Sequence, residues 1–328
     1  MRDAFGRRVD YLRISVTDRC NMRCQYCMPA EGMRWFERDD LLSYDEITKF
    51  VRDVAVPLGI RKLRLTGGEP LIREGVLELA RELSEIPGID DLALTTNGAL
   101  LARYATSLRQ SGVRRLNVSL DSLRPERFAA ITRGGDWHRV WQGLEAAGES
   151  GFEFLKLNCV VMRGFNEDEL VDFVALTVHR PWHVRFIEFM PVGDYALFKE
   201  VGFVPTAEML ERIQTRYTLN PLENAQVPGS GPARYWQVPG ARGSVGFISQ
   251  MSHDFCSSCN RVRLTSDGKL RHCLLSDHEL DVRTLMRSGV SSEAIRQAIA
   301  TDLTLKQERH NGATGISGAG RTMSQIGG

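Results

Sequence analysis

The chain has 328 residues, of which 42% are hydrophobic and 25% are charged, a composition typical of a globular protein that can bury a full core. The formal net charge of +1 gives no reason to expect nucleic acid or an anionic membrane surface as a partner. No apolar run approaches the ~20 residues that span a bilayer, and no apolar segment follows the charged N-terminus as in a signal peptide. We therefore expect a cytoplasmic protein.

Short apolar segments alternate with helical patterns through the first two-thirds of the chain. The clearest helix is predicted from Ser43 to Val54, because Ser43 and Glu46 fit a capping box and apolar residues recur every three or four positions. Alternating strands and helices predict a parallel sheet. Six units are too few to close an eight-stranded barrel, so we expect an α/β fold with a partial (βα)6 TIM-type barrel over residues 1–222. The predicted strands are Tyr11–Val16, Lys62–Thr66, Asp91–Thr95, Arg115–Leu120, Leu155–Val161 and Val184–Phe189.

Unusual residues follow several of these strands. The chain passes from the first strand into a cysteine group, and Gly67, Gly68, Glu69 and Pro70 follow the second. In a βα barrel the carboxyl ends of the strands and the loops after them build the active site. We therefore expect these residues to meet on one face.

The pattern changes after about residue 221. Residues 220–243 are rich in Pro and Gly and predict a linker or loop excursion. A second cysteine group, a short strand near Arg261–Ser266, and helices near Val282–Met286 and Ser292–Thr301 follow. We interpret residues 223–328 as a C-terminal domain, an α+β extension of the barrel that ends in a Gly-rich tail.

The first cysteine group has the spacing C-x3-C-x2-C and consists of Cys20, Cys24 and Cys27. Clustered thiols in a reducing compartment indicate metal or redox chemistry rather than disulfides. Three thiolates on one loop suit a [4Fe–4S] cube and leave one iron open to a small molecule. A zinc site is the alternative, but structural zinc normally has four closed ligands, and the loop offers no fourth Cys or His.

The second group has the spacing C-x2-C-x13-C and consists of Cys256, Cys259 and Cys273. With His253 or His272 as a fourth ligand it could hold zinc. The first group favours a second iron–sulfur cluster instead. The Arg261-Val262-Arg263 run directly after Cys259 would suit a polyphosphate beside it.

The first group, with Tyr26 before its third cysteine and Gly67-Gly68-Glu69-Pro70 after the next strand, resembles the radical S-adenosylmethionine (SAM) superfamily. The resemblance implies that SAM binds the open iron and is cleaved reductively to a 5′-deoxyadenosyl radical, which abstracts hydrogen from the substrate. It also implies that Tyr26, Gly68, Ser119 and Met190 bind SAM.

A narrower resemblance rests on residues 254–263, Cys273, Val184–Glu188 and the terminal Gly327-Gly328. These are similar to the GTP 3′,8-cyclase family, lyases that convert GTP to (8S)-3′,8-cyclo-7,8-dihydroguanosine 5′-triphosphate in the first step of molybdenum cofactor biosynthesis. The resemblance implies a second [4Fe–4S] cluster that binds guanine. It implies GTP contacts from Arg13, Arg64, Thr95, Lys156, Arg185, Arg261, Val262 and Arg263, and catalytic roles for Arg13, Arg261, Arg263, Gly327 and Gly328.

A triphosphate needs several Arg or Lys side chains, which supports this set of cations. Each of them could instead pair with Asp121, Glu69 or Glu188. Arg185 has the opposite strand parity to Glu188 and Met190, so not all three should point inward without a bulge. Without the catalytic role that the resemblance implies for Gly327 and Gly328, the Gly-rich tail would be interpreted as a frayed terminus. Cys159 is expected to be a buried structural thiol.

The same resemblance implies an unidentified electron donor, hand-off of the product to a cyclic pyranopterin monophosphate synthase, and a homodimer or a monomer–dimer equilibrium. One rival interpretation is another radical SAM enzyme with an auxiliary cluster, such as a peptide-modifying enzyme. The other is a non-enzymatic, zinc-stabilised nucleotide-binding module, which leaves Gly67–Pro70 unexplained.

Overall fold

We describe a computed structural model that covers residues 1–192, 195–223, 231–309 and 321–327. One sheet runs through it with the strand order β12-β11-β10-β1-β2-β3-β4-β5-β6-β9-β8-β7, and all neighbours from β10 to β9 are parallel. The strands are β1 (Tyr11–Ser15), β2 (Lys62–Thr66), β3 (Asp91–Thr96), β4 (Arg115–Ser119), β5 (Phe154–Val161), β6 (Trp182–Glu188), β7 (Asn220–Leu222), β8 (Arg234–Gln237), β9 (Ser244–Ile248), β10 (Arg261–Leu264), β11 (Lys269–Arg271) and β12 (Leu280–Asp281).

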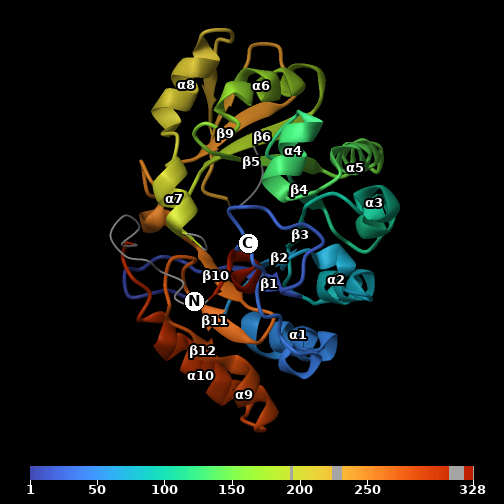
Figure 1. Cartoon of the computed structure of the whole chain (residues 1–328). Coiled ribbons are helices and arrows are strands. Elements are labelled where there is room, and N and C mark those ends of the chain that lie inside the picture. Colours follow the sequence, from blue (N-terminus) through green and yellow to red (C-terminus); the bar gives the residue numbers. More distant parts are fainter. Residues whose placement is uncertain (193–194, 224–230, 310–320, 328) are drawn as a thin grey trace.

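Helices follow the first six strands and cover the outer side of the curved sheet, where α1, α2, α3 and α5 succeed one another in Figure 1. The predicted partial barrel is therefore confirmed, with each predicted strand boundary within two residues of the observed one. The helices are α1 (Tyr44–Phe50), α2 (Val76–Glu85), α3 (Leu101–Gln110), α4 (Pro125–Thr132), α5 (Trp137–Glu149), α6 (Leu170–His179), α7 (Tyr195–Val201), α8 (Thr206–Gln214), α9 (Val282–Arg287), α10 (Ser292–Leu303) and α11 (Met323–Ile326).

The helix predicted from Ser43 begins as expected. The Ser43 hydroxyl accepts from the backbone N–H of Glu46, whose carboxylate accepts from the N–H of Ser43, so both halves of the capping box are present. The predicted apolar positions are buried. At Val51–Ala55 the geometry changes from α to π, which the sequence pattern did not indicate.

The two faces of the sheet differ in chemistry because side chains alternate along each strand. The apolar positions, such as Leu12, Leu63 and Leu116, pack in the core between the strands and the helices. The alternate positions face the inside of the barrel and are polar or cationic. They include Arg13, Arg64, Asn158 and Arg185, which line its cavity, and Asn117, which accepts from Arg185.

The prediction of a linker over residues 220–243 is wrong in part. β7 and β8 pair antiparallel within it, and β8 pairs with β9. Pro221 is compatible with a strand here because β7 is the last strand at this edge, where no further partner needs its N–H. Tyr235 on β8 is buried, which gives the hairpin an apolar contact.

Segments from the C-terminal third occupy both edges of the barrel. β9 extends it beside β6, and β10 extends it beside β1, with Arg263 in register with Arg13. The second cysteine group therefore lies next to the first strand, although about 240 residues separate them. The division of the chain at residues 222 and 223 stays a prediction.

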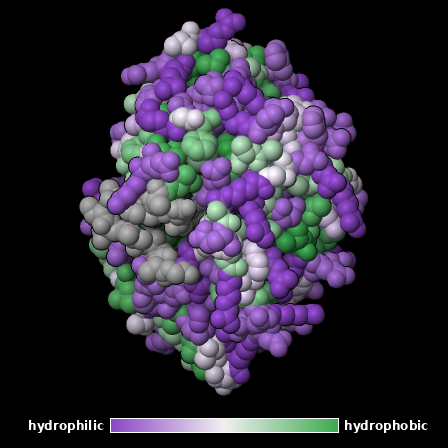
Figure 2. Space-filling model, in the orientation of Figure 1, coloured by the Kyte–Doolittle hydropathy of each residue, from purple (hydrophilic) through white to green (hydrophobic). Residues whose placement is uncertain are grey.

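Figure 2 shows mostly hydrophilic side chains on the visible face, interrupted by small apolar patches. Among the described residues, no helix is both long and apolar enough to cross a membrane.

Candidate active site

One cavity inside the barrel brings both cysteine groups together. It contains about 1750 Å³ of space free of protein atoms, part of it continuous with solvent. All six grouped cysteines line it and none forms a disulfide. Loops that are distant in the sequence thus converge as predicted, and the chemistry of either group can reach a molecule bound in between.

The first cysteine group lies on the loop after β1. The backbone N–H of Met22 donates to the sulfur of Cys20 at 3.4 Å, and the amide of Asn97 donates to the same sulfur at 3.7 Å. Burial, and then the nearby Glu69 carboxylate, raise the pKa of Cys20 to about 11. Burial also raises the pKa of Cys27, to about 12. These thiols would therefore lose their protons only when metal binds.

The spacing of the sulfurs bears on the choice between zinc and a cluster. Among the described residues, only one group of potential ligands has all its ligand atoms within 4.8 Å of one another, and it contains no cysteine. Sulfurs that share one tetrahedral zinc ion would lie about 3.8 Å apart, given a Zn–S bond of about 2.3 Å. Both cysteine groups are more open than that. A cube does not require its ligand sulfurs to lie so close together, because each sulfur binds a different iron.

The Gly67–Pro70 segment is built against the first cysteine loop. The N–H of Gly68 donates to the carbonyl of Thr17 at 2.7 Å, and the N–H of Glu69 donates to that of Arg19 at 2.8 Å. The Glu69 carboxylate accepts from Leu71, Thr96 and Asn97, and burial raises its pKa to about 7. The motif therefore fixes the loop that carries the thiols, in addition to any contact with a ligand.

We expect Gly68→Ala to lose the first cluster. A Cβ at position 68 would lie 2.1 Å from the carbonyl oxygen of Arg19 and 2.6 Å from that of Asp18, so the backbone would have to move. Overpacking of this kind costs about 1–3 kcal/mol of unfolding free energy. Iron content and thermal unfolding measure the result. The control is Gly148→Ala on α5, whose Cβ would meet nothing closer than 3.8 Å; equal iron loss in both variants would contradict the expectation.

The four residues predicted to bind SAM all line the cavity: Tyr26, Gly68, Ser119 and Met190. The Tyr26 hydroxyl donates to Asp121 at 2.7 Å, and burial raises the pKa of Asp121 to about 6. This bond joins Tyr26, on the cysteine loop, to the segment just after β4. Sequence reasoning considered Asp121 only as an ion-pair partner for a cation and missed this role.

The second cysteine group combines a short turn with a strand end. The N–H of Cys259 donates to the carbonyl of Cys256 at 3.1 Å, and the N–H of Leu275 donates to the sulfur of Cys273 at 3.4 Å. Burial alone would raise the pKa of Cys259, but the cations of Arg261 and Lys306 outweigh it and lower this pKa to about 7. A thiolate is therefore stabilised here, unlike in the first group.

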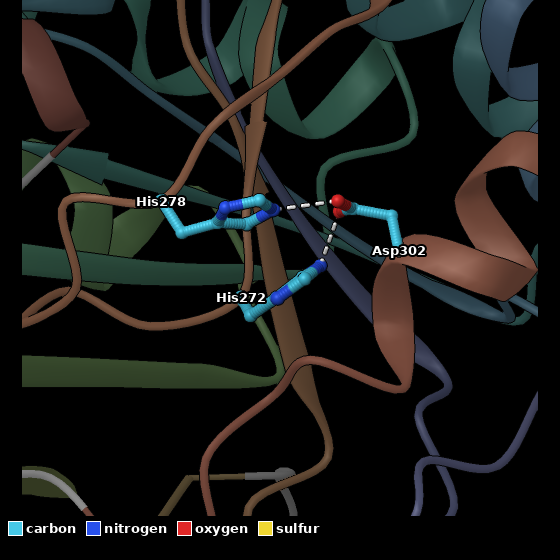
Figure 3. A group of neighbouring side chains, drawn as sticks. All are labelled: His272, His278 and Asp302. Carbon is cyan, nitrogen blue, oxygen red and sulfur yellow. Dashed lines mark hydrogen bonds and ion pairs between the residues drawn. The ribbon is translucent and has the colours of Figure 1, made fainter.

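Neither histidine proposed as a fourth zinc ligand belongs to a compact ligand group with these cysteines. His253 is exposed. The Nε2 atom of His272 lies 2.6 Å from a carboxylate oxygen of Asp302, whose other oxygen contacts His278 (Figure 3). The geometry of the described residues thus gives no support to a Cys3His zinc site.

The barrel interior is strongly cationic between the two cysteine groups. Predicted GTP contacts line the cavity at Arg13, Arg64, Thr95, Arg185, Arg261 and Arg263. Burial, and then Arg263 and Arg64, lower the pKa of Arg13 well below its usual range. Arg185 faces the cavity, where it donates to Asn158 at 2.8 Å and to Asn117, while Glu188 accepts from Thr206 and Ser252. The parity argument is wrong for Met190, which also lines the cavity, because Met190 lies beyond the end of β6 at Glu188.

Two predicted contacts lie outside the cavity lining. Lys156 is buried deeper in the barrel, over the rings of Phe154 and Tyr235, and burial lowers its pKa to about 6, assisted by Arg185 and Arg115. An anion nearby would restore its charge. The Val262 side chain packs in the hydrophobic core, which leaves only its backbone for a ligand. Arg115, which sequence reasoning did not select, pairs with Asp91 in the same deep layer.

Polar atoms in this cavity still lack partners. The Nε of Arg64 and the Oγ1 of Thr95 are buried without a hydrogen bond to any described residue. Unpaired buried groups are costly and often mark a ligand site. A polar, anionic ligand would satisfy them, so the donor set fits a nucleoside triphosphate.

The tail enters the barrel as far as Gly327. Arg321 binds Asp267 and Glu279, and α11 then leads to Gly327, whose carbonyl accepts from Arg13 at 3.3 Å and Arg263 at 3.2 Å. Figure 1 shows this end of the chain beside β1 and β10. Gly328 lies outside the described residues.

Comparisons with known proteins agree with this architecture. The model of the Radical SAM superfamily matches residues 14–177, and the model described as Molybdenum Cofactor Synthesis C matches residues 182–312. The GTP 3′,8-cyclase of Pelotomaculum thermopropionicum is 49% identical over 329 residues, covering 100% of both chains. The chain belongs to the GTP 3′,8-cyclase family. The GTP 3′,8-cyclase of Gloeobacter violaceus is also 49% identical, and the match covers 98% of this chain and 99% of that one.

Membership of the radical SAM superfamily implies SAM and a [4Fe–4S] cluster. The fold has a relative among solved structures, Streptococcus suis SuiB bound to S-adenosylmethionine. Its TM-score is 0.59 at 14% identity, and the match covers 90% of this chain and 68% of that one. At this identity the likeness concerns the fold alone.

Proposed function

We propose that the chain converts GTP to (8S)-3′,8-cyclo-7,8-dihydroguanosine 5′-triphosphate, the first step of molybdenum cofactor biosynthesis. The observation that supports this most is that both cysteine groups and the inner arginines line one cavity. The named relatives at 49% identity over essentially the full chain support the same reaction.

The proposal includes two [4Fe–4S] clusters. Cys20, Cys24 and Cys27 would hold the first, and Cys256, Cys259 and Cys273 the second. When bound, the first cluster and SAM supply the electron and the hydrogen-abstracting group. Tyr26, Gly68, Ser119 and Met190 would orient SAM, with the Asp121 carboxylate holding the Tyr26 ring in place.

The cationic interior would bind the triphosphate. We assign this role to Arg13, Arg64, Arg185, Arg261 and Arg263, with Lys156 behind them. A guanidinium group can donate two hydrogen bonds to the oxygens of one phosphate. Four of these five arginines lie on the neighbouring strands β10, β1 and β2, which fixes their spacing, and Arg185 lies on β6. Thr95 and the backbone of Val262 would contact the nucleoside.

Arg13, Arg261, Arg263, Gly327 and Gly328 are the proposed catalytic residues. The Gly327 carbonyl lies between the Arg13 and Arg263 guanidinium groups and orients both. These two side chains would hold GTP so that C3′ and C8 of the same molecule can approach, which converts ring closure into a favourably oriented intramolecular step.

The test is an anaerobic reconstitution with iron and sulfide. We expect about eight irons and no zinc per chain, and 5′-deoxyadenosine formed in step with the loss of GTP and the appearance of the cyclised product. Zinc in the second group, or SAM cleavage that is indifferent to GTP, would contradict the proposed substrate.

Gly327→Ala should lower cyclisation by about 10- to 100-fold, because small misplacements of orienting groups are costly. The residue has a φ of +86°, and its Cβ would lie 3.0 Å from the Ser15 Cβ and 3.3 Å from the Thr66 Cγ2. The control is Gly289→Ala, which has a similar φ of +74° but open space around its Cβ. Steady-state product formation is the measurement. Equal losses of activity in the two variants would mean that backbone strain alone is responsible, and would contradict the proposed role of Gly327.

A further inference from the structure

Lys306 is a buried lysine just after α10, with 4% of its surface exposed. Its ammonium group donates to the carbonyl of His272 at 2.6 Å and to that of Arg261 at 3.1 Å. It also lies 3.7 Å from the sulfur of Cys259, within donor range of a thiolate. One side chain therefore contacts the segments around two of the three cysteines in the second group.

The charge of this ammonium group needs a partner. A buried cation costs several kcal/mol unless an anion or a full set of hydrogen bonds compensates it. Within the described parts of the chain, Lys306 forms no ion pair with a carboxylate, and its acceptors are two carbonyls and the sulfur of Cys259. The sulfur is the one acceptor of the three that can carry a negative charge.

Asp302, near the end of α10, lies against the His272 side chain. Asp302 places one carboxylate oxygen 2.6 Å from His272 and accepts from His278 at 2.6 Å through the other (Figure 3). The Nε2 of His272 and the facing oxygen of Asp302 have no other hydrogen-bond partner among the described residues. Both separations are shorter than the roughly 3.3 Å between two ligands of one tetrahedral zinc ion, so we treat the group as direct polar contacts. Both residues therefore contact His272, which precedes Cys273: Asp302 contacts its ring and Lys306 contacts its carbonyl.

We propose that Lys306 is a positioning residue of the second cluster, which holds the Cys259 and Cys273 segments together and raises the reduction potential of that cluster. The inference rests on the proposed second cluster. A hydrogen bond to a ligand sulfur and a nearby positive charge both favour the reduced, more negative form of an iron–sulfur cluster. Arg7 contacts the same group, because it donates to the carbonyl of Cys256 at 2.7 Å.

The experiment compares Lys306→Met with the wild-type chain after anaerobic reconstitution. Both are studied in a Cys24→Ala background, so that the second cluster alone titrates. EPR-monitored redox titration measures its midpoint potential. We expect a shift to a more negative potential in Lys306→Met, a smaller shift in Lys306→Arg, which keeps the charge, and none in Lys49→Met, an exposed lysine on α1.

The outcomes separate this inference from the proposed function. A chain with wild-type Lys306 that binds no iron in the Cys24→Ala background overturns the second cluster itself, and the inference with it. An assembled second cluster whose potential is unchanged in Lys306→Met overturns only the role of Lys306.

If Lys306→Met with Cys24 intact keeps the first cluster and loses the second, the holding role is supported, because the first cluster reports a folded barrel. If Lys306→Met does not fold, Lys306→Gln is titrated instead, and an unchanged potential there overturns the inference.

Discussion

Cys24→Ala is expected to reduce SAM cleavage below detection and to halve the iron content. The change removes only the sulfur, since an alanine carbonyl can still accept from the N–H groups of Cys27 and Met28, as that of Cys24 does at 2.9 and 3.1 Å. With two thiolates left, the cube loses one of its three protein ligands, and no other cysteine belongs to this loop. Chromatographic detection of 5′-deoxyadenosine under reducing conditions measures the loss.

Cys159→Ala is the matched control for the same change of side chain. Cys159 packs in the core on the outer face of β5, and its sulfur lies 3.7 Å from the amide of Asn166. We expect a cost of about 1 kcal/mol in unfolding free energy from the lost packing and weak hydrogen bond, with iron content and SAM cleavage retained. If Cys24→Ala still cleaved SAM at the rate of this control, the assignment of the first cluster would be wrong.

Local patterns were sufficient to predict the first six strands and the capped helix. The strands have apolar residues on one parity, and Ser43 and Glu46 form a bonded pair three residues apart. The two cysteine groups were recognisable for the same reason, because each has its first two ligands within one short loop. The convergence of the strand ends on one cavity then follows from the parallel sheet.

Long-range contacts were beyond the sequence patterns. β10 was predicted as a strand, but nothing in residues 261–264 indicates that it pairs with β1. Within residues 220–243, β8 pairs with β9, a contact outside the segment that its Pro- and Gly-rich composition does not indicate. Arg7 and Lys306 have no motif around them, yet both reach the second cysteine group from the two ends of the chain. Such roles depend on tertiary packing, which propensity cannot reveal.

Cys259→Ala is expected to abolish cyclisation of GTP while leaving some SAM cleavage that is no longer coupled to it. The Cys259 sulfur lies beside Lys306 and near Arg261, so its removal takes away both a cluster ligand and the anion among these cations. The remaining two thiols would not retain the second cluster. The first cysteine loop keeps its own contacts with Gly68 and Asn97 and should still bind its cluster.

Product analysis distinguishes this result from general damage to the barrel. In Cys259→Ala we expect about half of the iron, no cyclised nucleotide, and 5′-deoxyadenosine formation that GTP no longer stimulates. The control is Ser257→Ala, an exposed position on the same turn, which should cyclise GTP normally. Normal cyclisation by Cys259→Ala would remove the second cluster from the mechanism. The inner arginines, which line the same cavity, would then have to position GTP without that cluster.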